Sequence, residues 1–455
     1  MAGIGFRLRA LASKDSYLEA TTAYLSSAVL STGPWLAGVL ALLILSSTTA
    51  TYLTPGDRSL LLATIISLFA ASLLVVGGPQ MLLTRYLADR LYSQDMASLA
   101  PTCTGVLFLN IPCALLAAPF LFFAPFTLLY RVLVVTLFLT LTMTWLETTF
   151  LSAARGYLRI VLIYLLSYAC GTVAAFLLGH AYGVPGSLAG FSLGELLCLS
   201  LLLGSIYREF PTARAVSWSY LSYFRPYWNL LAIGLLYTLG AWIDNLLFWV
   251  SSQGEIIHGF YHLFPPYDTA KFIVSLSTIP AAAVFMIRLE TNFYRHYHDF
   301  FRSIREKGTL VDLERARKGM IAAVRAGAWT ILKIQGIIAL FFCIIARDLA
   351  LFLGLAPRWV PLLRVQALAG LGQFMLFIMI LFLLYLDQRR AVLLVVALST
   401  LSNAGLTLAS FSLGEPFYGV GYLSSGWVGA ILCWFLLNAH LKHLEYQTFM
   451  SQPLS

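Results

Sequence analysis

An uncharged run near the middle of the chain restricts the fold more than any other feature. Residues 272–287 carry no charge, and at about 1.5 Å per residue they are roughly as long as the core of a bilayer-spanning helix. Lys271 precedes the run, and Arg288 and Glu290 follow it. Pro280 in its middle removes a backbone donor and favours a kink. A long apolar helix that has polar ends and can kink at a proline is typical of a membrane-embedded chain and unusual in the core of a soluble protein.

The composition also indicates a membrane protein. Of 455 residues, 60% are hydrophobic and only 11% charged, whereas soluble domains carry about 25% charged residues. The net charge is +9, but the basic residues lie in short loops between apolar runs, which indicates membrane orientation and not nucleic-acid binding. All six cysteines lie in apolar runs without a C-x-x-C pair, so we expect packing roles and neither a metal site nor a cofactor.

Apolar segments long enough to cross a bilayer recur along the whole chain. They cover residues 20–50, 59–84, 98–124, 127–152, 157–179, 184–206, 226–251, 270–292, 320–345, 360–386, 391–413 and 418–440. These twelve segments predict an all-α membrane protein with about twelve transmembrane helices.

The distribution of basic residues predicts the orientation. An even number of spans places both termini on one side, and that side carries twenty-two of the 29 Lys and Arg residues against six on the other. The positive-inside rule then places both termini in the cytoplasm. Residues 1–16 alternate basic and apolar side chains, as in an amphipathic segment at the cytoplasmic face. The long charged loop 294–318 either lies on anionic headgroups or docks a cytoplasmic partner.

A repeat divides the spans into two sets of six. Tyr182-Gly183-Val184 and Tyr418-Gly419-Val420 are each followed, five residues on, by a Gly–aromatic pair. A weaker echo relates the region after Pro79 to that after Pro280. We therefore predict two pseudo-symmetric six-helix lobes, 17–215 and 216–455, with the substrate path between them.

Several charged residues lie inside or at the ends of the predicted spans. Each charge at mid-bilayer costs roughly 2.5–3.5 kcal/mol, so such a residue is expected to face a cavity or a partner. The alternatives are an ion pair that joins two helices and a protonated carboxyl group hydrogen-bonded to the backbone. Together with nearby aromatic and amide groups they suggest a wet path whose predicted residues are Glu147, Glu195, Asp244, Glu290, Arg288, Lys333, Trp145, Trp242, Tyr237 and Gln373.

Three prolines are predicted hinges: Pro34 after Gly33, Pro79 after two glycines, and Pro280. Motifs of enzymes are missing from the sequence. It has no P-loop, and no Asp-x-Asp pair that would hold a metal–nucleotide sugar, so we expect no catalytic activity.

Five sequence blocks carry a resemblance to a known family. They are residues 1–9, Ser31-Thr32-Gly33-Pro34-Trp35, Trp242-Ile243-Asp244-Asn245, Pro266-Tyr267-Asp268 and residues 279–291. With these blocks the chain resembles the PelG family, the inner-membrane transporters of the Pel exopolysaccharide system. That family belongs to the superfamily of multidrug and oligosaccharidyl-lipid/polysaccharide exporters.

The resemblance implies a function and partners. The function is passage of a nascent N-acetylgalactosamine-rich polymer across the bacterial cytoplasmic membrane during biofilm matrix production. The implied partners are a PelF-like cytoplasmic glycosyltransferase, a PelD-like cyclic-di-GMP receptor and a PelE-like membrane protein, besides membrane lipids. Two alternatives remain open: an ion-coupled exporter of drugs or lipid-linked oligosaccharides, and a membrane scaffold of a polysaccharide synthase complex.

Overall fold

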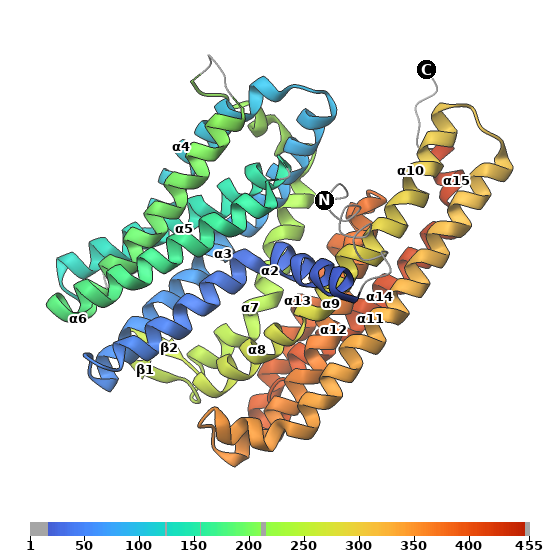
Figure 1. Ribbon diagram of the computed structural model, residues 1–455. Coiled ribbons are helices and arrows are strands. Elements are labelled where there is room, and N and C mark those ends of the chain that lie inside the picture. Colours follow the sequence, from blue (N-terminus) through green and yellow to red (C-terminus); the bar gives the residue numbers. More distant parts are fainter. Residues whose placement is uncertain (1–16, 123–124, 155, 211–214, 451–455) are drawn as a thin grey trace. The chain divides into compact units, whose positions relative to one another are not determined.

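Helices make up most of the chain in the computed structural model, which describes residues 17–122, 125–154, 156–210 and 215–450 (Figure 1). The predicted amphipathic segment 1–16 lies outside the described residues. Contacts divide the chain into two compact units: unit 1 is Met1–Thr32 with Pro265–Ser455, and unit 2 is Gly33–Phe264. The boundaries of these units differ from those of the predicted lobes, 17–215 and 216–455. The lobes were predicted from the sequence repeat and remain a prediction.

Unit 2 is built from long apolar helices joined by short turns. Its elements are the second part of α2 (Tyr17–Thr49), α3 (Pro55–Tyr92), η1 (Met96–Ser98), α4 (Leu99–Phe122), α5 (Leu128–Ala153), α6 (Tyr157–Glu209), η2 (Ser219–Tyr223), α7 (Trp228–Val250), β1 (Glu255–Ile257) and β2 (Tyr261–Leu263). Helix α3 packs against both α5 and α7, and α5 packs against α6. The two strands form an antiparallel hairpin that turns through His258 and Gly259, both with positive φ.

Glycines allow α3 and α7 to approach closely. A Cβ atom at Gly77 would lie 2.3 Å from the Thr238 hydroxyl, and one at Gly234 would lie 2.1 Å from the Gly77 carbonyl. Small residues bring helix backbones together in a membrane, where packing replaces the hydrophobic effect as the driving force. These glycines therefore set the distance between α3 and α7.

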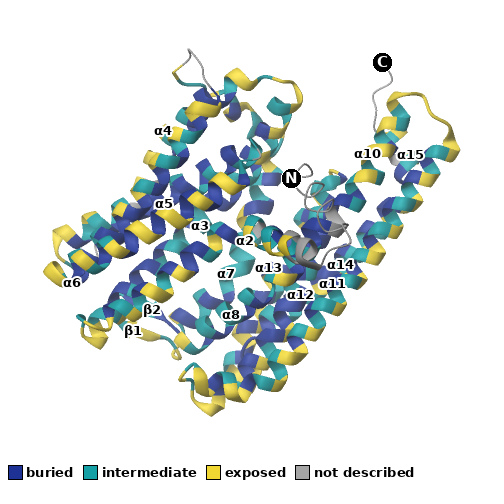
Figure 2. Ribbon diagram, viewed as in Figure 1, coloured by how far each residue is buried: buried dark blue, intermediate teal, exposed yellow. Residues whose placement is uncertain are grey.

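Unit 1 contains the remaining spans. Its elements after the start of α2 are α8 (Pro265–Ser277), α9 (Ile279–Val284), η3 (Phe285–Glu290), α10 (Thr291–Arg305), α11 (Leu310–Phe352), η4 (Pro357–Trp359), α12 (Val360–Tyr385), α13 (Arg389–Leu413), η5 (Glu415–Phe417), α14 (Val420–Lys442) and α15 (Leu444–Met450). Helix α14 packs against α12 and α13, and α11 packs against α12 and α10. Figure 2 shows buried residues between neighbouring helices. Outward faces carry large apolar side chains such as Leu340 and Ile344, as expected in lipid.

The twelve predicted spans are confirmed. Ten helices of the described chain are long and apolar enough to cross a membrane. One of them, α6, has 53 residues and contains two predicted spans, and α4, with 24 residues, provides another. At about 1.5 Å per residue, 53 residues in one straight helix would be roughly 80 Å long, far more than one bilayer crossing requires. The chain is instead non-helical at Gly183, and the two halves of α6 pack against each other at Gly171 and Gly194.

The two glycines of the sequence repeat adopt related conformations. Gly183 has φ 64° and ψ −141° and breaks α6 between its two spans. Gly419 has φ 89° and forms the N-cap of α14. Both positions lie in the region of positive φ that favours glycine, at the start of the last span of each predicted lobe. The repeat thus marks a glycine of positive φ at the same place in each predicted lobe, although the ψ angles, −141° and −8°, differ.

The central uncharged run is not one helix. Helix α8 ends at Ser277, and Pro280 lies in the first turn of α9, where its missing N–H is not needed. Residues 285–290 then form a π-helix before α10 begins. Helices α10 and α11 form a hairpin that includes most of the charged segment 294–318. The π-helix has no counterpart in the sequence prediction; such turns are frequent at functional sites.

Candidate functional site

Glu195 is a fully buried carboxylate within unit 2. It lies on the second half of α6 and has no exposed surface. Among the described residues neither carboxylate oxygen has a hydrogen-bond partner, although Tyr168 lies beside it. An unpaired carboxyl group in a membrane-embedded core is costly, so Glu195 is a candidate functional position.

Glu147 is the second buried acid of unit 2. Its Oε2 atom accepts a hydrogen bond from the Cys103 thiol at 2.7 Å, which links α5 to α4. Its Oε1 atom has no partner in the described part of the chain. Among the described residues no hydrogen bond joins Glu147 to Glu195. Glu147 and Glu195 are therefore separate acidic positions of unit 2 and not a carboxylate pair.

Trp145, a predicted path residue, is used for packing inside unit 2. Its indole Nε1 donates to the Ser72 hydroxyl on α3 at 3.1 Å. Its ring lies 6.1 Å from that of Phe69 and 6.4 Å from that of Tyr164, between centroids. The side chain thus connects α3, α5 and α6. Its indole N–H is bonded to Ser72 and is not free to hydrogen-bond a sugar.

Helix α7 carries three predicted path residues on two faces. Tyr237 and Asp244 are seven residues apart and share one face, and Asp244 is fully buried. Trp242 shares a second face with Trp249, and the two rings meet edge to face at 6.2 Å. The structure therefore groups Tyr237 with Asp244 and separates them from Trp242.

Unit 1 contains a set of buried amides. The Gln373 amide on α12 donates to the Tyr422 carbonyl at 2.8 Å and to the Ser425 hydroxyl at 2.9 Å, both on α14. Gln335 on α11 is fully buried, and its amide donates to Ser277 on α8 at 3.3 Å. Its carbonyl oxygen has no partner among the described residues. These amides bring α8, α11, α12 and α14 into one polar interior.

The sequence prediction missed two members of this polar interior. Gln366 is fully buried, and both its amide nitrogen and its amide oxygen lack partners within the described chain. It lies seven residues before Gln373, so the two share a face of α12, and this spacing was the available signal. Lys271 of α8, predicted as a loop charge, lies over the Tyr422 ring at 4.0 Å from its centroid.

The remaining predicted path residues of unit 1 lie apart from the amides or cannot be placed. Lys333 is exposed on α11, with its ammonium group over the exposed Trp329 ring at 5.5 Å from the centroid. The side chains of Arg288 and Glu290 lie outside the described residues. Their backbone belongs to the π-helix.

The three predicted hinge prolines occupy different kinds of position. Pro34 lies within α2, where the chain passes from unit 1 to unit 2 after Thr32. Pro79 lies within α3, beside the glycines that contact α7. Pro280 follows the break after α8. Their role as hinges stays a prediction.

The chemistry of these groups differs between the units. Amide groups hydrogen-bond neutral hydroxyl and acetamido groups as donor and as acceptor, and they carry no charge that must be neutralised. Buried carboxylates favour cations. Among the described residues no group of three or more His, Cys, Asp or Glu side chains is arranged to hold a metal ion.

Comparison with solved structures identifies the fold. A MOP superfamily transporter from Pyrococcus furiosus superposes with a TM-score of 0.66 at 12% identity, over 93% of this chain and 96% of that one. A MATE transporter from Vibrio cholerae in its bent form gives 0.66 at 11% identity, over 96% and 98%. An outward-facing MATE family transporter of the MOP superfamily gives 0.66 at 12% identity, again over 96% and 98%. The chain therefore has the fold of these two-lobed, twelve-helix transporters.

A search among curated proteins found no match. The sequence model of the PelG family, described as a putative exopolysaccharide exporter, matches residues 1–449. Because this match covers nearly the whole chain and the fold is that of a multi-pass membrane transporter, the chain belongs to the PelG family of putative exopolysaccharide exporters.

Proposed function

We propose that the chain exports a nascent N-acetylgalactosamine-rich polysaccharide of the Pel type across the bacterial cytoplasmic membrane. Membership of an exporter family and the MOP transporter fold support export as the activity. The amide-lined interior of unit 1 supports a neutral sugar as the cargo. Gln366 is the observation that carries this proposal, because a buried amide with both polar atoms free is ready to bind hydroxyl or acetamido groups.

The test replaces Gln366 with an apolar residue of similar size. Removing a buried, unsatisfied amide is nearly neutral or stabilising for the fold. We expect Gln366→Leu to accumulate in the membrane at the normal level, while secreted polymer falls by about tenfold because sugar hydrogen bonds are lost. The matched control is Gln388→Leu, since the Gln388 amide bonds only the Leu386 carbonyl in its own turn. Normal secretion by Gln366→Leu would show that Gln366 does not line the polysaccharide path.

The cytoplasmic partners form part of the same proposal. A PelF-like glycosyltransferase would supply the growing chain, with PelD-like and PelE-like proteins in the complex. The α10–α11 hairpin supports such docking, because residues 310–325 precede the apolar run of α11 and extend about 20 Å beyond it. Co-purification of the full-length chain with these proteins tests this, and deletion of residues 302–312 is expected to abolish it.

A second candidate function is ion-coupled export of small molecules or lipid-linked oligosaccharides. The unpaired Glu195 carboxylate favours it, because such a group can take up a proton or a cation. Transport of a cationic dye by the purified protein in vesicles with an imposed proton gradient would support this candidate. Loss of that transport in Glu195→Gln would assign the coupling to this residue.

A further inference from the structure

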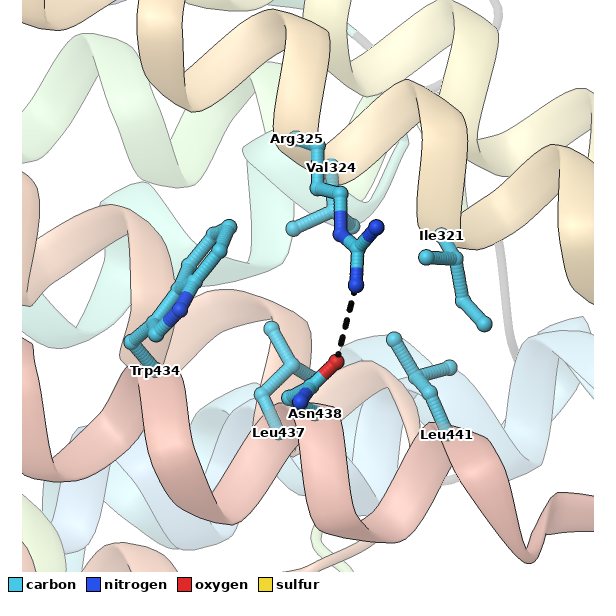
Figure 3. A pocket seen from close by; sticks show the side chains of 7 residues that line it. All are labelled: Ile321, Val324, Arg325, Trp434, Leu437, Asn438 and Leu441. Carbon is cyan, nitrogen blue, oxygen red and sulfur yellow. Dashed lines mark hydrogen bonds between the residues drawn. The ribbon is translucent and has the colours of Figure 1, made fainter.

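A shallow groove runs between α11 and α14 in unit 1 (Figure 3). It is open to the outside and shallow, with room for about one water molecule. Its lining residues are Ile321, Val324, Arg325, Trp434, Leu437, Asn438 and Leu441. Four of them are aliphatic, so the groove is mainly apolar with a few polar groups.

The polar groups of the groove are mostly hydrogen-bond donors without acceptors. Arg325 makes one long hydrogen bond, 3.4 Å, to the Asn438 side-chain oxygen. In the described chain no carboxylate lies within ion-pair distance of Arg325, and neither the Asn438 amide nitrogen nor the Trp434 indole N–H donates to a protein acceptor. Figure 3 shows Arg325 directed toward the Asn438 side of the groove. A guanidinium, an amide and an indole N–H together fit an anion with several acceptor oxygens.

The position of the groove along the helices matches a membrane surface. Arg325 directly precedes residues 326–346, which carry one charge, Lys333, and at about 1.5 Å per residue are roughly 30 Å long, the thickness of a bilayer core. Arg347 follows the other end of this run. On α14, Asn438 lies one turn before the basic end at Lys442, and Trp434 lies one turn deeper. Tryptophan is common at this depth, where the bilayer meets water.

We propose that this groove binds the phosphate of an anionic phospholipid from the leaflet at the basic end of unit 1. The phosphate oxygens accept from Arg325, Asn438 and Trp434, and the lipid chains lie on the apolar outer surface of α11. That surface continues with Trp329 and Lys333, one and two turns deeper than Arg325. Basic pockets between helices at this side of a membrane bind acidic headgroups. A lipid is favoured over a soluble anion because the groove is aliphatic and opens at bilayer depth.

The test measures lipid binding to the purified full-length protein by native mass spectrometry, with phosphatidylglycerol and phosphatidylcholine of equal chain length. We expect one phosphatidylglycerol to bind about tenfold more tightly than phosphatidylcholine, because charge-assisted hydrogen bonds add to the apolar contact. Arg325→Gln is expected to remove this preference. Trp434→Phe keeps the aromatic surface but loses the donor, and is expected to weaken binding about threefold.

The matched control is Arg315→Gln, which removes an equal charge from the exposed, ion-paired start of α11, away from the groove. This variant is expected to keep the preference within about twofold of the original chain. Retention of the preference in Arg325→Gln would overturn the proposal, as would its loss in Arg315→Gln. A second measurement compares how much inorganic phosphate and phosphatidylglycerol raise the unfolding temperature of the protein. We expect inorganic phosphate to raise it little. An equal rise with both would identify a site for a free anion and overturn the lipid proposal.

Discussion

At the scale of single residues, the buried polar groups differ in whether their polar atoms have hydrogen-bond partners. The amide of Gln373 is satisfied by α14, and Trp145 is satisfied by α3. Gln366 and Glu195 have no partners for their polar atoms within the described chain. Unsatisfied polar atoms in a core lower stability, so they are expected where a ligand or ion completes the bonding. This contrast separates packing residues from candidate functional residues better than residue type does.

Glu195→Met tests this contrast by stability. Methionine has nearly the same shape but no group that needs a partner, so we expect the free energy of unfolding to rise by about 1–3 kcal/mol while export falls. Unfolding of the detergent-solubilised protein, followed by circular dichroism in denaturant, gives the measurement. Glu209→Gln is the control, because Glu209 is exposed and paired with Arg159 at 3.0 Å, and its effect should stay within about 0.5 kcal/mol. A large destabilisation in Glu195→Met would mean that the carboxylate is satisfied after all.

At the scale of elements, backbone turns recur where the sequence repeat predicts them. Gly183 and Gly419 were singled out by the repeated Tyr-Gly-Val, and both have positive φ. A Cβ atom at Gly183 would meet nothing within 4 Å, so only its backbone conformation requires glycine. We expect Gly183→Ala to cost about 1–3 kcal/mol of unfolding free energy.

Gly204 is the matched control for that prediction. It also has open space around a Cβ atom, but it lies in the second half of α6 with ordinary helical φ. Gly204→Ala should therefore be neutral or stabilising by about 0.4–1 kcal/mol, because alanine loses less entropy in a helix. Equal effects of the two substitutions would refute the conformational role of Gly183. Both can be measured by denaturant unfolding of the same preparation.

The start of α11 responds to pH. The Thr309 hydroxyl oxygen accepts from the Asp312 backbone N–H at 3.3 Å, and the Thr309 backbone N–H donates to the Asp312 carboxylate at 3.2 Å, which together form a capping box. The Thr309 hydroxyl also donates to that carboxylate, at 2.7 Å. The Thr309 hydroxyl, followed by its backbone N–H, holds the pKa of Asp312 below its ordinary value. The carboxylate thus stabilises the helix start above the ordinary pKa of aspartate, and this stabilisation is lost as the pH falls through the lower folded value.

Hydrogen exchange measures this effect at residues 309–313. After correction for the intrinsic rate, opening of the segment should increase on acidification from pH 6 to pH 3. Asp312→Asn should open more readily at pH 6 and show no further dependence on pH. The same acid response in Asp312→Asn would assign the effect to another group.

The elements also show what the sequence could and could not predict. Hydropathy located all twelve spans, because the length of an apolar run is a local property. It did not show which side of α11 faces the interior, because both sides of that helix are apolar. Lys333, which was predicted in the path, is exposed on α11, whereas the buried Gln366 was overlooked. The π-helix 285–290 was also unpredictable, since it depends on how neighbouring helices pack.

At the scale of the whole molecule, the chain passes between its compact units at two points. One follows Thr32 inside α2, and the other precedes Pro265 at the start of α8. Each crossing has a proline at or beside it, Pro34 in the first case and Pro265 in the second. Pro34 removes a helical hydrogen bond inside α2, so bending costs little there, whereas Pro265 begins α8 and removes none.

Reporter fusions test the arrangement of all twelve spans at once. With both termini in the cytoplasm, green fluorescent protein fused after residue 455 should fluoresce, and alkaline phosphatase fused there should be inactive. Alkaline phosphatase inserted after Gly354 or Gly414 should be active, because one helix, α12 or α13, separates each of these turns from the basic turn at Asp387. The positive-inside rule predicts that Arg389 and Arg390 beside Asp387 keep that turn in the cytoplasm. An active phosphatase at the C-terminus together with an inactive one after Gly414 would invert the topology. The groove at Arg325 would then face the outer leaflet, and the α10–α11 hairpin could not receive a polymer from a cytoplasmic enzyme.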